Sequence, residues 1–190
     1  MTLRITSLTV LTFLLVGCAE IPSSGGSVGT GRLHEDAEHL ARDLVQIDPS
    51  ISSEDAVSAA LVALKETQAL RKQFRPITPA ILNNCLVNLR LKDGGLCYHW
   101  AGQIYVALAD RRFKTLDIHW GLTNRGNKWR EHNVVVVSAH GRRFEDGILL
   151  DAWRFGGRLL WMPVGKDATY GWEEVGGVEL AYRIEASKRL

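Results

Sequence analysis

Apolar residues recur at helical spacing through the first half of the chain. Between residues 33 and 47 they fall on a single helical face, which predicts an amphipathic helix. Ser52, followed by the acidic Glu54 and Asp55, is typical of a capped helix start. A second helix is therefore predicted through residues 56–71, so that the folded part of the chain is expected to open with two helices.

Two further helices are predicted before the pattern changes. Thr78 is a capping residue and Pro79 suits the first turn of a helix, so a third helix is expected to begin there and to end at the Gly94-Gly95 pair. A fourth helix is expected to begin at about Cys97 and to continue to Leu108. The apolar side of the third helix is expected to consist of Leu82, Cys85, Leu86 and Leu89.

The second half of the chain carries shorter apolar runs that are typical of strands. Residues 116–122 alternate between apolar and polar, whereas 132–138 and 148–153 are continuous and partly β-branched. Residues 158–162 and 178–184 are expected to add two more strands. Helices followed by an antiparallel sheet predict an α+β fold.

The first 17 residues are expected to be a signal peptide. A cationic start at Arg4 precedes an apolar segment at 5–16 that is too short for a stable transmembrane span. The segment ends in Leu-Val-Gly-Cys18, which resembles a bacterial lipobox; the resemblance implies cleavage before Cys18 and lipid attachment to its sulfur. A plain secretory signal, cut at Gly17 or Ala19, is the alternative. Ala19 after the cysteine favours, by analogy with such lipoproteins, the outer membrane, with the domain facing the periplasm.

Residues 18–31 are rich in Gly and Ser and are expected to form a flexible tether. Residues 32–190 then form one domain, which is long enough to bury a real core. The formal net charge is only +2, and no basic run of the kind that binds nucleic acid is present. Nucleic acid is therefore not an expected partner; the membrane that holds the lipid anchor and a peptide or protein of the cell envelope are. The sequence does not indicate an oligomeric state.

Cys97 is the strongest candidate for chemistry. It follows Gly94-Gly95-Leu96 and opens a predicted helix, where the helix dipole and free backbone N–H groups favour a thiolate. The same N–H groups can hold the oxyanion that forms when a thiolate attacks a carbonyl. Two alternatives stay open at this point: an inert buried thiol and a disulfide with Cys85.

His132 and Asp151 are expected to complete a triad with this cysteine. If 132–138 and 148–153 are adjacent antiparallel strands that turn at Gly141-Arg142, the two residues lie opposite each other at the same end of the sheet. Opposed residues have Cβ atoms about 5 Å apart, which permits a carboxylate–imidazole hydrogen bond. The aspartate then orients the ring and leaves its other nitrogen to face the sulfur. A bulge near 146–147 would shift this register.

Three short motifs resemble the transglutaminase-like cysteine peptidase superfamily: Gly95-Leu-Cys97-Tyr-His-Trp, His132-Asn-Val-Val-Val-Val and Leu150-Asp-Ala-Trp153. In that family the cysteine opens a helix, the histidine starts a strand and the aspartate lies on the next strand. The intervals of 35 and 19 residues between the three suit this arrangement. The resemblance implies a papain/transglutaminase-like core and a thiol enzyme that hydrolyses or transfers an amide. Asn-Val-Val stands where many members have an aromatic residue, which leaves the substrate class open.

The sequence thus predicts a cysteine peptidase, amidase or acyltransferase with Cys97, His132 and Asp151 as its catalytic residues. The alternative is an envelope lipoprotein that binds a peptide or protein without catalysis. No cofactor or metal is expected, because no CxxC or HExxH motif is present; a zinc site of Cys97, His119 and His132 is the weaker reading. Candidates for an oxyanion donor upstream of the cysteine are Asn83, Asn84 and Asn88.

Overall fold

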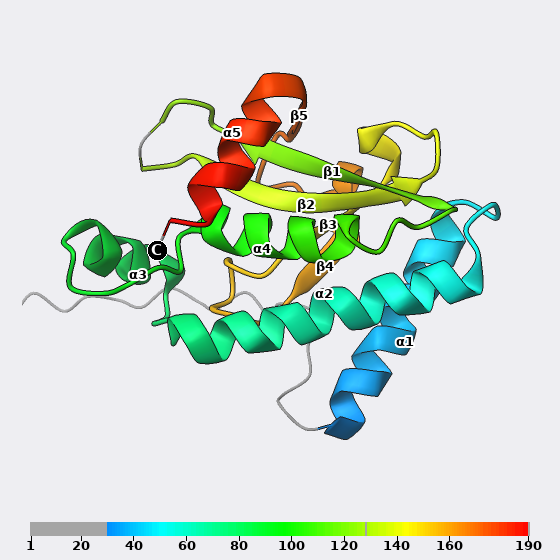
Figure 1. The fold of residues 1–190 in the computed structure, drawn as a ribbon, viewed down its shortest axis with the longest axis horizontal. Helices are drawn as coiled ribbons and strands as arrows, with labels where there is room; N and C mark the ends of the chain where they lie inside the picture. Colours follow the sequence, from blue (N-terminus) through cyan, green and yellow to red (C-terminus); the bar gives the residue numbers. More distant parts are fainter. Residues whose placement is uncertain (1–29, 128, 190) are drawn as a thin grey trace, which may run out of the picture.

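The computed structural model describes residues 30–127 and 129–189. The predicted signal peptide and Cys18 lie outside these residues, as does nearly all of the predicted tether. The described chain has five α-helices and one five-stranded antiparallel sheet, and this confirms the α+β class (Figure 1). The helices are α1 (Thr30–Ile47), α2 (Ser53–Phe74), α3 (Ala80–Asn88), α4 (Cys97–Ala109) and α5 (Gly177–Ser187). The strands are β1 (Leu116–Thr123), β2 (His132–Ala139), β3 (Ile148–Asp151), β4 (Leu160–Pro163) and β5 (Glu173–Val175).

The sheet has the order β4-β3-β2-β1-β5, with all neighbours antiparallel. β2 lies at its centre, and all eight residues of β2 are buried. This explains the continuous apolar run at this point in the sequence, because a central strand covered on both faces needs no polar alternation. His132 is the first residue of β2, and the sheet holds it through its pairing with Thr123 of β1.

The first two helices and α4 cover one face of the sheet. Ser52 caps α2 as predicted: its hydroxyl accepts a hydrogen bond of 3.1 Å from the Asp55 N–H. Figure 1 shows α4 directly against β1 and β2, with α2 on its far side and α1 crossing α2. Trp100, Ile104 and Leu108 of α4 are buried in the main core. The helix that begins with Cys97 is therefore held rigidly between the sheet and α2.

α5 packs against α4 through a contact that requires glycine. A Cβ atom on Gly102 would lie only 1.9 Å from the Ser187 hydroxyl oxygen, so no other residue fits without a shift of α5.

The opposite face of the sheet carries a second, smaller core. It is formed by Val134, Val136, Phe144, Leu149 and Val164.

One predicted strand is wrong. Residues 178–184 form most of the helix α5, and the edge strand β5 lies just before it. Alternation would bury positions 178, 180, 182 and 184 together. Instead Val178 and Tyr182 are exposed, whereas Leu180 and Ile184 pack against the core and Ser187 is buried. This spacing of four and three residues is helical.

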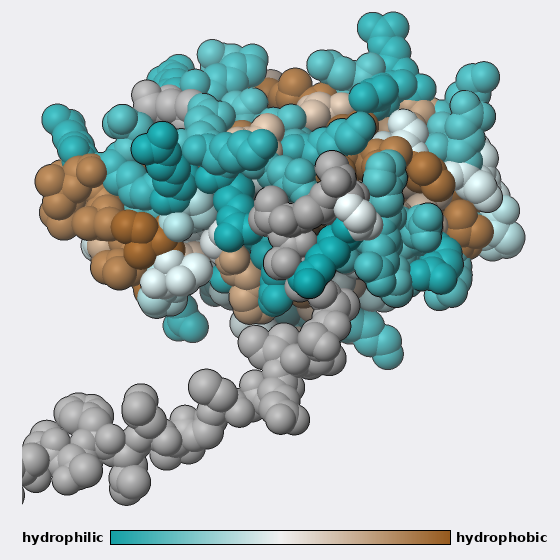
Figure 2. Space-filling view, turned by 90° about the horizontal axis from the view of Figure 1, so that it is seen from below, coloured by the Kyte–Doolittle hydropathy of each residue, from teal (hydrophilic) through white to brown (hydrophobic). Residues whose placement is uncertain are grey.

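The third helix forms, but it is shorter than predicted and its apolar side is not buried. α3 ends at Asn88, six residues before Gly94, and Leu82 and Leu89 are 45% and 67% exposed. The buried face contains Asn83 instead, whose Nδ2 donates to the Gly95 carbonyl at 3.1 Å. Figure 2 shows apolar side chains gathering at the α3 end of the molecule, where Ile81 and Leu91 are also exposed.

The register between β2 and β3 also differs from the prediction. Val135 pairs with Leu150 and Val137 with Ile148, so the strands are offset by two residues from the alignment that would place His132 opposite Asp151. The cause is the single 3₁₀ turn at Phe144–Asp146, which lengthens one side of the connection. A shift of two residues keeps each side chain on its expected face, because side chains alternate with a period of two. β3 also ends at Asp151 rather than at 153.

Candidate active site

Cys97 lies at the first turn of α4, where the chain enters the helix after two glycines. Gly94 and Gly95 have φ angles of 66° and 89°, a conformation that favours glycine. The side chain is 6% exposed. Its Sγ lies 3.6 Å from the Glu131 carbonyl oxygen and accepts a hydrogen bond of 3.5 Å from Asn133 Nδ2. The start of β2 therefore holds the sulfur in place.

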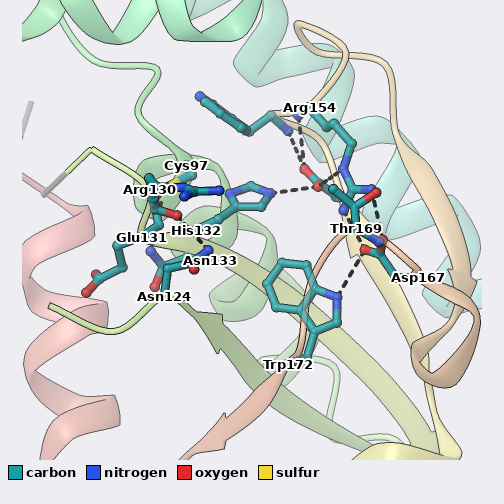
Figure 3. A network of polar contacts seen from close by, with 12 residues as sticks. Cys97, Asn124, Arg130, Glu131, His132, Asn133, Arg154, Asp167, Thr169 and Trp172 are labelled. Atoms are coloured by element: carbon teal, nitrogen blue, oxygen red, sulfur yellow. Dashed lines mark hydrogen bonds and ion pairs between the residues drawn. The ribbon is translucent and has the colours of Figure 1, made fainter. Parts of the chain in front are cut away.

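The structure brings His132 and Asp151 together with Cys97. His132 Nε2 lies 2.7 Å from Asp151 Oδ2, and the two side chains are 2% and 1% exposed. The predicted hydrogen bond is thus present, across a diagonal of the sheet rather than between directly opposed residues. The other ring nitrogen, Nδ1, is buried and has no hydrogen-bond partner among the described residues. In Figure 3 the ring lies between Cys97 and the carboxylate to which a dashed line joins it.

The carboxylate of Asp151 is fixed by the loop that follows it. Its Oδ1 accepts hydrogen bonds of 3.0 Å from the backbone N–H groups of Trp153 and Arg154. Its Oδ2 accepts from Arg154 Nε at 2.9 Å in addition to its contact with His132. The carboxylate therefore cannot rotate without breaking several bonds, and it holds the imidazole in one orientation.

Arg154 extends this network to a third segment. Its Nη2 lies 2.6 Å from Asp167 Oδ2, and the same carboxylate accepts from Trp172 Nε1 at 3.0 Å (Figure 3). The Arg154 guanidinium also lies 4.9 Å from the centre of the Tyr170 ring. This single arginine thus joins the end of β3 to residues 167–172.

Charge and burial act in opposite directions on the pair. Burial alone would lower the pKa of His132, but the Asp151 carboxylate and the contact with Cys97 outweigh it and raise that pKa to about 10. Burial would likewise raise the pKa of Asp151, yet His132 and Arg154 hold it at about 2. Both groups are therefore charged at neutral pH.

Aromatic side chains enclose the imidazole. The ring centres of Trp153, Tyr170 and Trp172 lie 4.6, 5.3 and 5.5 Å from that of His132. They exclude water from the His132–Asp151 hydrogen bond, which strengthens its electrostatic component.

The sequence pointed to the triad but not to Arg154, Asp167, Tyr170 or Trp172. The one available signal was the position of Arg154, three residues after the predicted orienting aspartate.

A cavity of about 290 Å³ opens beside the sulfur. Its described lining residues mix polar and apolar side chains, and the one charged residue among them is Glu131, whose carboxylate is already bonded to Arg183 and to the Gly126 N–H. The lining residues are Asn84, Asn88, Leu96, Cys97, Tyr98, Gly126, Trp129, Glu131 and Asn133. The cavity has room for a planar amide and a few neighbouring atoms next to Cys97.

The remaining candidates lie elsewhere. Cys85 and Cys97 are both free thiols, and Cys85 is half-buried on α3. His119 contacts Glu174 at 2.6 Å and Ser138 at 2.8 Å, so it does not join Cys97 and His132 in a zinc site. Within the described residues no group of three or more His, Cys, Asp or Glu side chains is placed to hold a metal ion. None of the described helices is long and apolar enough to cross a membrane.

Comparison of the chain with protein-family models gives no match, and comparison with curated proteins and with solved structures gives none either.

Proposed function

We propose that this protein is a cell-envelope lipoprotein with thiol acyl-transfer activity on a papain/transglutaminase-like core. The observation that carries the proposal is the buried His132, which is bonded to Asp151 on one side and faces Cys97 on the other. Burying an ion pair of this kind costs free energy, because both charges lose their hydration, so the pair is weak evidence of a purely stabilising role. A cysteine nucleophile accounts for it, since an imidazolium stabilises the adjacent thiolate.

The positions of the three groups support the following chemistry. The Cys97 thiolate attacks a peptide or amide carbonyl in the cavity, forming an S–C bond while the carbonyl electron pair moves to oxygen. Return of that pair breaks the C–N bond, and His132 gives its proton to the leaving amine. Asp151 keeps the ring oriented throughout. Water or a second amine then attacks the thioester carbonyl, His132 takes the proton from it, and the C–S bond breaks to release the acyl product and restore the Cys97 thiolate.

Alkylation of the full chain by iodoacetamide at neutral pH tests this proposal. Cys97 is expected to react faster than Cys85, as resolved by peptide mass spectrometry, despite its smaller exposure. His132→Ala is expected to slow labelling of Cys97 by about tenfold or more, since the thiolate loses its imidazolium partner. The rate at Cys85 serves as the internal control.

Two results would turn the proposal toward a binding lipoprotein without catalysis. One is a Cys97 that reacts no faster than Cys85. The other is a His132→Ala variant whose labelling rate and pH profile match those of the parent. The lipid anchor is tested separately with Cys18→Ser, which is expected to leave the membrane fraction or to stay unprocessed.

A further inference from the structure

Two neighbouring asparagines of α3 differ in how their side-chain amides are used. Both ends of Asn83 are engaged: Nδ2 donates to the Gly95 carbonyl and Oδ1 accepts from the Ile77 N–H at 3.4 Å. Asn84 uses only its oxygen, which accepts a hydrogen bond of 3.0 Å from Trp153 Nε1. Its Nδ2 makes no hydrogen bond to another described residue, and the side chain lines the cavity beside Cys97.

The tryptophan determines which way the Asn84 amide faces. An indole N–H can only donate, so the amide oxygen must face Trp153 and the NH₂ group must lie on the opposite branch of the planar amide. Trp153 itself is fixed, because its ring packs 4.6 Å from that of His132 and its backbone N–H is bonded to Asp151. Asn84 is therefore held by the same residues that hold the proposed base.

Other groups around Cys97 point to a ligand at the same place. Cys97 and Tyr98 are the first two residues of α4, whose backbone N–H groups cannot be paired within the helix. His132 Nδ1, on a side chain 98% buried, is without a hydrogen-bond partner in the described chain. A carbonyl group bound at the sulfur would meet donors from the helix start on one side and from α3 on the other.

We propose that the Asn84 side-chain amide donates a hydrogen bond to the oxygen of the acyl group that Cys97 attacks, together with the backbone N–H groups at the start of α4. The inference rests on the proposed function and assigns a further catalytic residue to it. In the attack the sulfur bonds to the carbonyl carbon, and the carbonyl electron pair moves to the oxygen that Asn84 faces. Donors placed in advance at this oxygen stabilise the charge as it develops.

Two reactions of Cys97 separate this role from a structural one. With iodoacetamide the sulfur attacks the CH₂ carbon, an S–C bond replaces the C–I bond as iodide leaves, and no oxyanion forms. With p-nitrophenyl acetate the sulfur attacks the ester carbonyl, and a tetrahedral oxyanion forms. The C–O bond then breaks, p-nitrophenolate departs, and Cys97 carries the acetyl group as a thioester. Loss of an oxyanion donor therefore slows the second reaction and leaves the first unchanged.

The experiment measures both rates in the full chain and in three variants. Asn84→Ala is expected to slow acetylation at least about tenfold, since one oxyanion donor typically contributes roughly 10²–10³ in rate, with alkylation within about twofold of the parent. Trp153→Phe keeps the ring against His132 but removes the indole N–H, so a smaller, acetylation-selective loss is expected. Asn88→Ala is the matched control, because Asn88 lies one turn further along α3 and lines the same cavity, yet no hydrogen bond to another described residue orients its amide.

The outcomes are distinct. Selective loss of acetylation in Asn84→Ala supports the assignment. Equal slowing of both reactions would show that Asn84 acts only by holding Trp153, and unchanged rates would show that it does not act at all; either result overturns the assignment. A parent protein in which Cys97 reacts rapidly with neither reagent overturns the proposed function itself, and the role of Asn84 with it.

Discussion

Two histidines near Cys97 are almost equally buried but have opposite electrostatic properties. His132 is 2% exposed and His99 is 3% exposed. Burial lowers the pKa of His99 to about 4, against a smaller opposing effect of the Arg189 backbone, whereas the pKa of His132 is raised to about 10. Burial therefore does not distinguish these two histidines; the carboxylate beside His132 does.

The surroundings of the two rings explain the difference. His99 Nδ1 accepts a hydrogen bond of 3.3 Å from the Leu96 N–H, and its ring packs between Phe74 and Tyr98. A backbone N–H can only donate, so this bond requires an unprotonated Nδ1 and favours the neutral ring. His132 instead meets the ionised Asp151. One histidine completes the start of α4 as a neutral cap, and the other is a cation beside Cys97.

Removing the carboxylate has the largest expected effect on this contrast. Asp151→Ala leaves the buried His132 without its counter-charge, and breaking a buried pair from one side typically costs about 3–5 kcal/mol of unfolding free energy. Urea denaturation measures it. Asp117→Ala is the matched control: it breaks the exposed His140–Asp117 pair, where at most about 1 kcal/mol is expected. Similar losses in the two variants would mean that the buried carboxylate is not the stabilising partner.

Removing the charge while keeping the shape has a smaller effect on stability. Asp151→Asn retains a hydrogen-bond acceptor for His132, but without the negative charge burial dominates and the pKa of His132 is expected to fall toward that of His99. An NMR titration of the ring protons follows both histidines in one sample. His99 should titrate unchanged. If His132 in the variant still titrates near pH 10, Asp151 is not the cause of its raised pKa.

The sequence allowed the three triad residues to be predicted because each stands at an element boundary with a local signal. Cys97 follows two glycines, His132 begins an apolar run and Asp151 follows one. Their diagonal arrangement could not be predicted, because the offset between β2 and β3 depends on a 3₁₀ turn that carries no strong sequence signal. A register error of two residues still left the pair on the correct face.

The groups around the triad were harder to predict for a different reason. Arg154 and Asp167 are joined only by the folded path of the chain after β3, and the sequence gives no spacing rule for such a contact. The helix α5 was taken for a strand because Val178, Leu180, Tyr182 and Ile184 alternate over a short span, where strand and helix patterns overlap. Only the packing of Leu180 and Ile184 against the core distinguishes the two.

The smallest expected effect concerns the pH dependence of stability and sharpens the contrast from the side of His99. The pKa of His99 is about 4 in the folded chain and 6.5 for the unperturbed group. Between these values the unfolded state binds more protons, so His99 makes the fold less stable as the pH decreases. His132 affects stability in the opposite direction: its contribution to the unfolding free energy is complete below pH 6.5 and is lost as the pH rises toward 10.

The variant His99→Asn can still accept a hydrogen bond from the Leu96 N–H but cannot titrate in this range. The unfolding free energy of this variant, measured between pH 4 and 6.5, is expected to depend less steeply on pH than that of the parent, by up to about 1.4 kcal/mol per pH unit for one proton. A slope equal to that of the parent would show that His99 is not the neutral histidine of the pair, and the difference between the two rings would then lie in His132 alone.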